Sequence, residues 1–243
     1  SSLTILSLPV LFNYKSKVTI IEKNFYKNFK IYLKSSGKIS YKPFPKPHLL
    51  VENATINLKK PPVKDNLIKI SNLKIFISLK DLYLRSFSDF VSTKLSDVNI
   101  ELKINDIKEL RKHFYQKINK PIMLINAKIF LKNAKDEVIL ISPTNKITYK
   151  INNKSKIKYF NIDGKIFGLN FNSEWKRKYD TPNMSFHNIN IFNPNIEVQN
   201  ILKFKNNQKF EGQSQIKYAQ NKLEYKYTFD NNNINISSPN KKK

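Results

Sequence analysis

Apolar and polar residues alternate with a period of two over most of this 243-residue chain. In "VNIELKIN", residues 98–105, every second side chain is aliphatic and the side chains between them are polar or charged. Successive side chains of a strand point to opposite faces, so each such strand has one apolar and one polar face, which is typical of antiparallel sheet. The two clearest apolar rows are Leu73, Ile75, Ile77 and Leu79, and Val98, Ile100, Leu102 and Ile104. The pattern predicts a mainly β protein.

The alternation returns in residues 147–151 and 223–229, whereas two other segments lack it. Residues 172–183, "NSEWKRKYDTPN", combine Asn, Pro and charge and are predicted to form a long loop. Residues 231–243 are rich in Asn and Lys and are predicted to fray or to continue into further residues. Neither segment marks a domain boundary, so residues 15–243 are interpreted as one β-rich domain.

Two other segments have helical spacing, with apolar residues three or four positions apart. The second of them follows Asp106, a suitable N-cap. We expect two short helices in the N-terminal half, near residues 17–30 and 106–118. Their apolar stripes are Ile21, Phe25 and Phe29, and Ile107, Leu110, Phe114 and Ile118.

The first twelve residues, "SSLTILSLPVLF", are mostly apolar and precede Lys15 and Lys17. The run is shorter than the roughly 20 residues that a membrane-spanning helix needs. Two interpretations stay open: residues 1–14 are the exit end of an N-terminal membrane anchor, or an ordinary buried strand around Pro9.

The formal net charge is +26, but only Arg85, Arg111 and Arg177 among the 44 basic residues are arginines. A dedicated phosphate-reading site favours arginine, whose planar guanidinium binds two oxygens at once. The composition therefore favours solvated, lysine-rich faces. Binding of nucleic acid or another polyanion stays the alternative function, in which Tyr225 and Tyr227 of "EYKYTF" would be stacking platforms. Their alternation with charged residues also fits one strand with two faces.

Candidate chemistry is sparse. The chain has no cysteine, which excludes disulfides, thiol catalysis and thiolate metal sites. His48, His113 and His187 lack metal-binding spacing, and His48 is expected to be an exposed turn residue. Asp136 and Glu137 are expected in a solvent-facing hairpin turn. We predict no catalytic residue, no metal and no cofactor; a carbohydrate-active β-enzyme would need two carboxylates that the fold brings together.

The most informative stretch is residues 37–58, "GKISYKPFPKPHLLVENATINL". Pro43, Pro45 and Pro47 fix φ and remove backbone donors, so a central strand cannot continue between Tyr41 and His48. The chain must change direction there and then resume a strand.

The order of elements around this break resembles the N-terminal region of the AsmA family. In that family a helix precedes a strand with a proline-bearing kink, then a strand of the form apolar-x-apolar-x-Asn/Asp-x-x-apolar. A strand ending in a short Leu-containing turn and its partner strand follow. The resemblance covers residues 15–170, with Asn126–Ala127 where the family often has an Asn-Gly-like turn. The corresponding segments are Ile21–Phe29, Gly37–Tyr41, Pro43–Pro47, Leu49–Leu58, Leu67–Leu84 and Leu95–Ile104.

The resemblance implies a non-enzymatic protein of outer-membrane biogenesis, held in the inner membrane by one N-terminal helix. Its bulk would lie in the periplasm of a Gram-negative bacterium. Its curved or groove-like sheet would shelter or transfer membrane phospholipid, and no specific nucleic acid is expected as a partner. The groove candidates are Leu73, Ile75, Ile77, Leu79, Val98, Ile100, Leu102 and Ile104. The pattern alone fits a covered core equally well, so both arrangements stay open.

Overall fold

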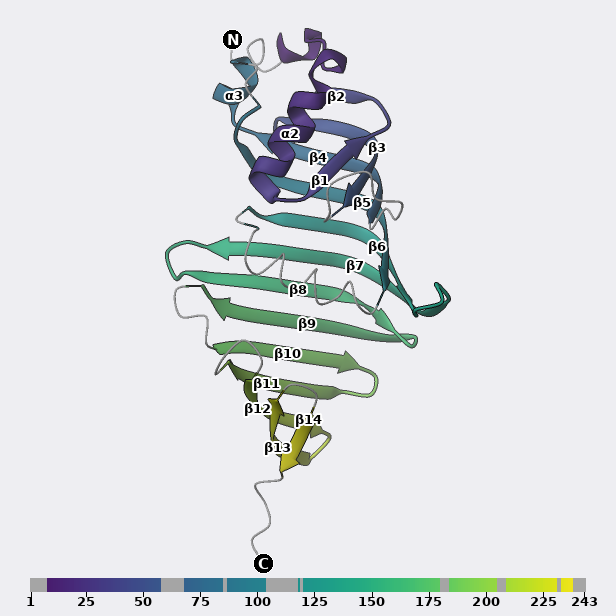
Figure 1. Cartoon of the computed structure of the whole chain (residues 1–243), viewed down its shortest axis with the longest axis vertical. Helices are drawn as coiled ribbons and strands as arrows, with labels where there is room; N and C mark the ends of the chain where they lie inside the picture. The colour runs from purple at the N-terminus through teal and green to yellow at the C-terminus, as the bar shows by residue number, and fades with distance from the viewer. Residues whose placement is uncertain are drawn as a thin grey trace, which may run out of the picture. The chain divides into compact units, whose positions relative to one another are not determined.

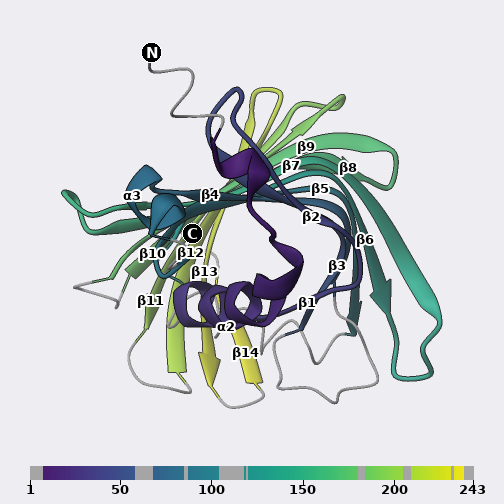
Figure 2. The same cartoon turned by 90° about the horizontal axis from the view of Figure 1, so that it is seen from above.

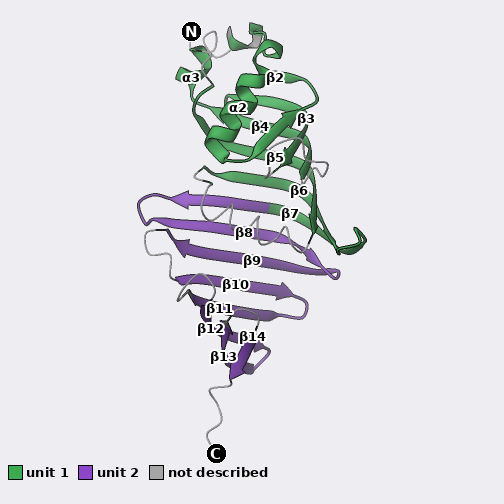
Figure 3. Ribbon diagram, viewed as in Figure 1, with its two compact units in different colours: residues 1–146 green, residues 147–243 purple. Residues whose placement is uncertain are grey.

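The computed structural model describes residues 8–57, 68–84, 87–103, 118, 120–179, 184–204, 209–230 and 233–237. The chain divides into two compact units, residues 1–146 and residues 147–243, which are coloured separately in Figure 3. The boundary falls within strand β7 (Val138–Asn152). No linker-like composition marks this position in the sequence.

Unit 1 combines sheet with helix (Figure 1). Its 3-10 turns are η1 (Leu8–Leu11) and η2 (Lys15–Lys17), and its helices are α2 (Val18–Phe29) and α3 (Leu79–Tyr83). Its strands are β1 (Tyr32–Ser35), β2 (Ile39–Lys42), β3 (His48–Asn57), β4 (Ile68–Ile77), β5 (Phe90–Lys103), β6 (Ile122–Lys132) and the first part of β7. The strand order is β1-β3-β4-β5-β6-β7, and β2 also pairs with β3.

The β5–β6 pair is parallel, whereas β3 pairs antiparallel with β1, β2 and β4, and β4 does so with β5. A parallel pair needs a crossover connection, here the chain between Lys103 and Ile122. The helix predicted near residues 106–118 falls in this connection. Apart from the fully buried Ile118, it lies outside the described residues.

The proline run forms the turn of a hairpin. Strands β2 and β3 pair from Ile39–Val51 to Lys42–His48, so residues 43–47 reverse the chain direction. His48 is buried rather than exposed as expected, because β2 and β4 flank it and its ring lies 5.5 Å from that of Phe76. Its Nδ1 lies 2.7 Å from the Lys46 carbonyl oxygen, and burial lowers the pKa of His48.

Helix α2 covers the inner face of the unit 1 sheet. Figure 2 shows it beneath the arching strands β1 to β5. Its stripe Ile21, Phe25 and Phe29 has no exposed surface, which confirms the predicted first helix and its face. The Phe25 ring lies 6.4 Å from that of Phe90 on β5. The Asn28 amide donates to the Ser88 carbonyl (3.0 Å), which ties the helix end to the same strand entry.

The segment before α2 packs onto unit 1 through Tyr14. The buried Tyr14 hydroxyl donates to the Pro9 carbonyl at 2.7 Å, and its ring lies 6.1 Å from that of Phe87. Within the described part of the chain, no helix is long and apolar enough to cross a membrane. The anchor interpretation of residues 1–14 stays a prediction.

A row of polar residues crosses the sheet at the same level on successive strands. Asn53, Asp97 and Asn126 have positive φ, and the pairing registers place Ser71 between the first two of them. At this level the inward-facing positions of the strands shift by one residue, for example from Leu95 to Val98 on β5, while the registers on either side stay one-to-one. The turn expected at Asn126–Ala127 is therefore wrong: both residues lie inside strand β6, where Asn126 has left-handed backbone, which Asn tolerates.

Gly37 lies against this row and leaves no room for a side chain. A Cβ atom there would clash with the carbonyl oxygen of Glu52, next to Asn53. Ser36 satisfies the backbone of Asn53 at this position: its hydroxyl and its backbone N–H both donate to the Asn53 carbonyl oxygen (2.7 and 2.9 Å).

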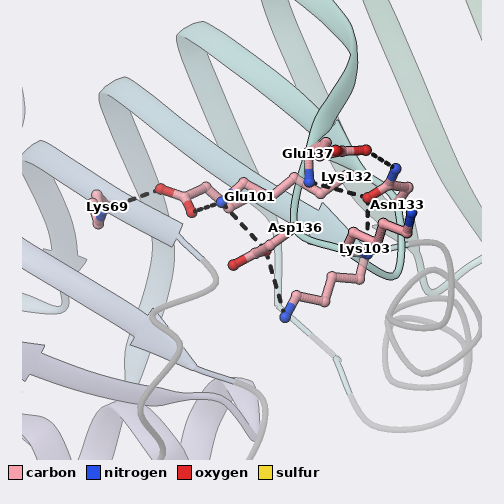
Figure 4. Close-up of polar contacts among 8 residues, drawn as sticks. Lys69, Glu101, Lys103, Lys132, Asn133, Asp136 and Glu137 are labelled. Carbon is pink, nitrogen blue, oxygen red and sulfur yellow. Dashed lines mark hydrogen bonds and ion pairs between the residues drawn. The ribbon is translucent and has the colours of Figure 1, made fainter.

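The outer face of unit 1 carries a charge network (Figure 4). Glu101 on β5 accepts hydrogen bonds from Lys132 on β6 (2.8 Å) and Lys69 on β4 (3.1 Å). These bonds lower the pKa of Glu101, the bond from Lys132 more than that from Lys69. Asp136 in the β6–β7 turn pairs with Lys132 at 3.6 Å. Asp136 and Glu137 thus occupy the predicted hairpin turn, closed by the Asn133 amide donating to the Glu137 carboxylate (2.7 Å).

Unit 2 is an antiparallel meander in chain order. After the end of β7, the strands are β8 (Ile157–Ile166), β9 (Leu169–Lys178), β10 (Met184–Phe192), β11 (Ile196–Phe204), β12 (Lys209–Tyr218), β13 (Asn221–Asp230) and β14 (Asn233–Ser237).

The loop predicted over residues 172–183 is wrong for residues 172–178, which belong to β9, and part of the predicted frayed tail is β14. Both segments are held extended by pairing with the neighbouring strands, β8 and β10 for β9 and β13 for β14, rather than by a local apolar pattern.

The structure confirms a mainly β fold with antiparallel sheet that curves without closing. Among the described residues the helices α2 and α3 both lie in the N-terminal half; α2 is the first predicted helix, whereas α3 was not predicted.

The packing of α2 predicts a large effect of Phe25→Ala. Removing a fully buried aromatic ring leaves a cavity under the helix, so the free energy of unfolding should fall by about 3–5 kcal/mol. Urea unfolding followed by circular dichroism measures this. Lys23→Ala, on the exposed side of the same helix, is the control and should change stability by less than ~0.5 kcal/mol. Equal losses in both variants would contradict the role of α2 as a cover.

Glu101→Gln should remove a pH-dependent contribution to stability. The lowered pKa means that the carboxylate stabilises the fold above its ordinary pKa of about 4.3, and that this contribution disappears as pH falls through the lower folded value. The variant should be less stable than wild type at pH 7 by under ~1 kcal/mol, because the pair is partly solvated. Thermal unfolding between pH 7 and pH 3 should show the gap closing; a constant gap would refute this assignment.

Candidate functional site

The predicted groove residues do not form an open surface in unit 1. Six of them are buried in its core, so their inward faces are covered by protein. Leu79 lies in α3 and is 45% exposed, because the Ser78 hydroxyl accepts from the Asp81 N–H (3.1 Å), caps this helix and ends the strand pattern. Ile104 lies outside the described residues. The buried residues are Leu73, Ile75, Ile77, Val98, Ile100 and Leu102.

Unit 2 presents a different surface, which we call the apolar face. The strand registers align alternate residues of β8 to β13 into rows that cross the sheet. One row is Ile162, Ser173, Ile189, Val198, Ile216 and Leu223, and the next row on the same face contains Phe171, Ile191, Ile196 and Tyr218. The row between them, on the opposite face, is entirely polar: Asp163, Asn172, Asn190, Glu197, Lys217 and Lys222.

No other described element of unit 2 covers the apolar face. Every described element of unit 2 is a strand of the sheet, and beyond Tyr149 no apolar side chain of the described residues is buried. Leu223 is 57% exposed and Ile236 is 68% exposed, whereas Leu73 in unit 1 has no exposed surface. Apolar patches larger than a few hundred Å² are uncommon on soluble monomers and usually mark a binding surface.

An aromatic cluster occupies the β12–β13 part of this face. Phe210 stacks on Phe229, with centroids 4.8 Å apart and planes 11° apart. The Tyr227 ring lies across Gly212, where a Cβ atom would clash with it, and its hydroxyl donates to Asn200 Oδ1 at 2.8 Å. An aromatic ring over a glycine in the neighbouring strand fills the space that a side chain would occupy. The cluster gives the face a fixed shape.

Polar groups also lie on the apolar face. Ser173 and His187 are 2.9 Å apart between Oγ and Nε2, and burial lowers the pKa of His187. A serine nucleophile needs a base that a third group orients. No carboxylate among the described residues bonds to the His187 ring, so the pair lacks that third group. Lys158 on β8 faces Arg177 on β9 in register, and burial, followed by the nearby guanidinium, lowers the pKa of Lys158.

The opposite, polar face contains a hollow of about 300 Å³ over β9 to β12. Its charged groups are already paired: Lys176 lies 2.9 Å from Glu174, and Gln215 donates to Glu224 at 2.8 Å. The described residues contain no cluster of His, Asp or Glu that could hold a metal ion.

The sequence analysis did not identify the apolar face as a candidate site, because Ser173, His187 and Ser214 interrupt its rows. Alternation of apolar and polar residues, tested separately for each segment beyond residue 172, would have indicated it.

The structure predicts that Gly212→Ala displaces the Tyr227 ring and breaks its hydrogen bond to Asn200. We expect a loss of about 1–3 kcal/mol in the free energy of unfolding, as for other overpacked sites, measured by urea denaturation. In a Tyr227→Ala background the same substitution should be nearly neutral, since nothing remains to clash with. A full loss in both backgrounds would show that the ring does not lie over Gly212.

No family model matches this chain, and a search of curated proteins also finds no match.

Proposed function

We propose that the apolar face of unit 2 holds the acyl chains of membrane phospholipid. The observation that carries the proposal is the absence of any buried apolar side chain beyond Tyr149 in the described residues, although the strands there have a largely apolar face. Acyl chains would remove this surface from water, at about 25 cal/mol per Å² of apolar area.

The dimensions of the face support an elongated apolar ligand. The row from Ile162 to Leu223 crosses six strands, which are spaced about 4.8 Å apart, so it extends for about 24 Å. One leaflet contributes roughly half of the ~30 Å hydrocarbon core of a bilayer. A row of this length accommodates an extended acyl chain, and parallel rows accommodate the second chain of the same lipid.

The resemblance to the AsmA family extends the proposal to a cellular role. A lipid sheltered on a sheet can move between membranes without exposing its chains to water. In this proposal the protein is held at the inner membrane, its β-rich body lies in the periplasm, and it serves outer-membrane biogenesis as a lipid carrier rather than an enzyme. The anchor, the location and the direction of transport belong to the proposal.

The alternative is a polyanion-binding protein, which the net charge of +26 favours. The polar face of unit 2 argues against it, because Lys176, Lys217 and Lys222 lie 2.9, 3.2 and 2.6 Å from glutamate carboxylates. Tyr225 and Tyr227 stand on the apolar face, opposite Lys226, and do not alternate with cations on one surface. Lipid therefore fits the exposed face better than nucleic acid.

Val198→Asp tests the proposal. Val198 is half-buried in the middle of the apolar face, so a carboxylate there stays partly hydrated and the unit should remain folded, while lipid should be lost. Lipid that co-purifies with the full chain is extracted and counted by mass spectrometry. We expect at least a tenfold loss relative to wild type.

Gln199→Asp is the matched control, because it adds the same charge at the next position on the opposite, polar face and should retain lipid. Ile100→Asp, in the core of unit 1, should instead unfold that unit, since it buries an unpaired charge. The proposal fails if wild type carries no lipid, or if Val198→Asp and Gln199→Asp retain equal amounts.

A further inference from the structure

We propose that one edge of unit 1 binds the surface of a lipid bilayer that contains anionic lipid. This edge, which we call the basic edge, consists of the β2–β3 turn (residues 43–47), helix α3 and the turns η1 and η2. The inference goes beyond the proposed function, because it concerns the other unit and a membrane surface rather than a bound lipid molecule.

The strand registers and two local contacts bring these segments together. His48 follows the β2–β3 turn and is in register with Phe76, three residues before α3 begins. The turn η1 lies against β2, the strand that leads into the β2–β3 turn. Tyr14, immediately before η2, places its ring 6.1 Å from that of Phe87, shortly after α3. Figure 1 shows α3, β2 and the purple turns that precede α2 at the same end of unit 1.

Three apolar side chains project from the basic edge. Leu11, Leu84 and Phe44 are 84%, 67% and 62% exposed, the highest values for large apolar side chains among the described residues of unit 1. They stand at the end of η1, directly after α3 and in the β2–β3 turn. Amphipathic segments bind membranes by placing such side chains at the boundary between head groups and acyl chains.

The exposure of these side chains does not come from loose packing of the edge. Tyr14 and Leu82 beside them are buried, and the Tyr14 hydroxyl donates to the Pro9 carbonyl oxygen at 2.7 Å. Pro43 and Pro45 flank Phe44 and restrict the backbone of its turn. Because the segments already have a fixed shape, binding through them costs little conformational entropy.

The charge of the edge complements an anionic surface. Within the described residues 8–17, 42–48 and 78–84, Asp81 is the only carboxylate, and it accepts hydrogen bonds from the Ser78 and Ser88 hydroxyls at 2.7 Å each. The lysines attract anionic head groups, and each lysine adds to the affinity for such a membrane. The exposed lysines of these residues are Lys15, Lys42, Lys46 and Lys80.

The projecting side chains favour a bilayer over nucleic acid as the anionic partner. Leu11 and Leu84 are aliphatic, so they offer no ring on which a base could stack. A phosphate backbone would use only the lysines and leave the apolar side chains in water. A bilayer surface binds both, since its head groups carry the charge and its acyl chains begin just beneath them.

The test is sedimentation of the 243-residue chain with vesicles of phosphatidylcholine alone, or of phosphatidylcholine with an equal amount of phosphatidylglycerol. Wild type should bind the mixed vesicles several-fold more tightly than the phosphatidylcholine vesicles, and high salt should weaken this preference. Lys42→Gln with Lys46→Gln should weaken binding to the mixed vesicles roughly tenfold. Leu11→Ser with Phe44→Ser should weaken binding to both kinds of vesicle several-fold.

Matched controls make the same substitutions elsewhere in unit 1. Lys34→Gln with Lys128→Gln removes two exposed lysines from β1 and β6, and Ile139→Ser with Ile141→Ser removes two half-exposed apolar side chains from β7. Both control variants should bind vesicles as wild type does. All the substituted side chains are exposed, so the variants should remain folded, which circular dichroism checks.

Several outcomes would overturn the inference. These are binding of wild type to neither kind of vesicle, equal binding to both kinds, and equal losses in the edge variants and their controls. Binding of a DNA oligonucleotide without binding of vesicles would show that the lysines recognise a polyanion instead.

The outcomes also separate this inference from the proposed function. Val198→Asp, on the apolar face of unit 2, should bind the mixed vesicles as wild type does. If it loses vesicle binding while the edge variants retain it, the membrane contact belongs to unit 2 and this inference fails. If wild type carries no lipid but binds vesicles through the basic edge, the proposed function fails and this inference stands.

Discussion

The packing of α2 against the inner face of the unit 1 sheet is the contact that distinguishes the covered face of unit 1 from the exposed apolar face of unit 2. Phe25 and Phe29 pack against the concave side of the arching strands and have no exposed surface themselves. They help to turn an apolar sheet face into a core. Unit 2 has the same alternation of side chains but contains no helix among its described residues, and its apolar side chains beyond Tyr149 are not buried.

A row of irregular residues decides which side chains point inward. Asn53, Asp97 and Asn126 have positive φ, and the buried positions change parity at this level, for example from Val51 to Ala54 on β3 and from Leu95 to Val98 on β5. The registers stay one-to-one across the row, so the strands change parity together. If one strand lacked this irregularity, its apolar residues beyond that level would point outward while those of its neighbours pointed inward. The polar row therefore keeps the inward-facing positions of neighbouring strands matched. Hydrogen bonds such as that from the Ser71 hydroxyl to the Asp97 carbonyl (3.3 Å) connect the strands at this level.

The exposed face of unit 2 combines features that suit an amphiphile. Its central rows are aliphatic, and its β12–β13 part is an aromatic cluster. On the opposite face, Lys176, Lys217 and Lys222 pair with glutamates. Charged residues and an apolar face are compatible because they occupy opposite sides of the same strands.

The sequence by itself determined that the protein is mainly β, through the period-two alternation, and located α2, through the four-residue spacing of Ile21, Phe25 and Phe29. Both periods follow directly from the local geometry of strands and helices. The proline run likewise had to interrupt a strand, since proline lacks an N–H. Tertiary structure alone decided which apolar face is covered. Leu73 and Val198 have similar local patterns, but Leu73 has no exposed surface and Val198 is only half-buried. Lys158 and Arg177 meet because a hairpin sets their register, a pairing that neither residue's neighbours in sequence reveal.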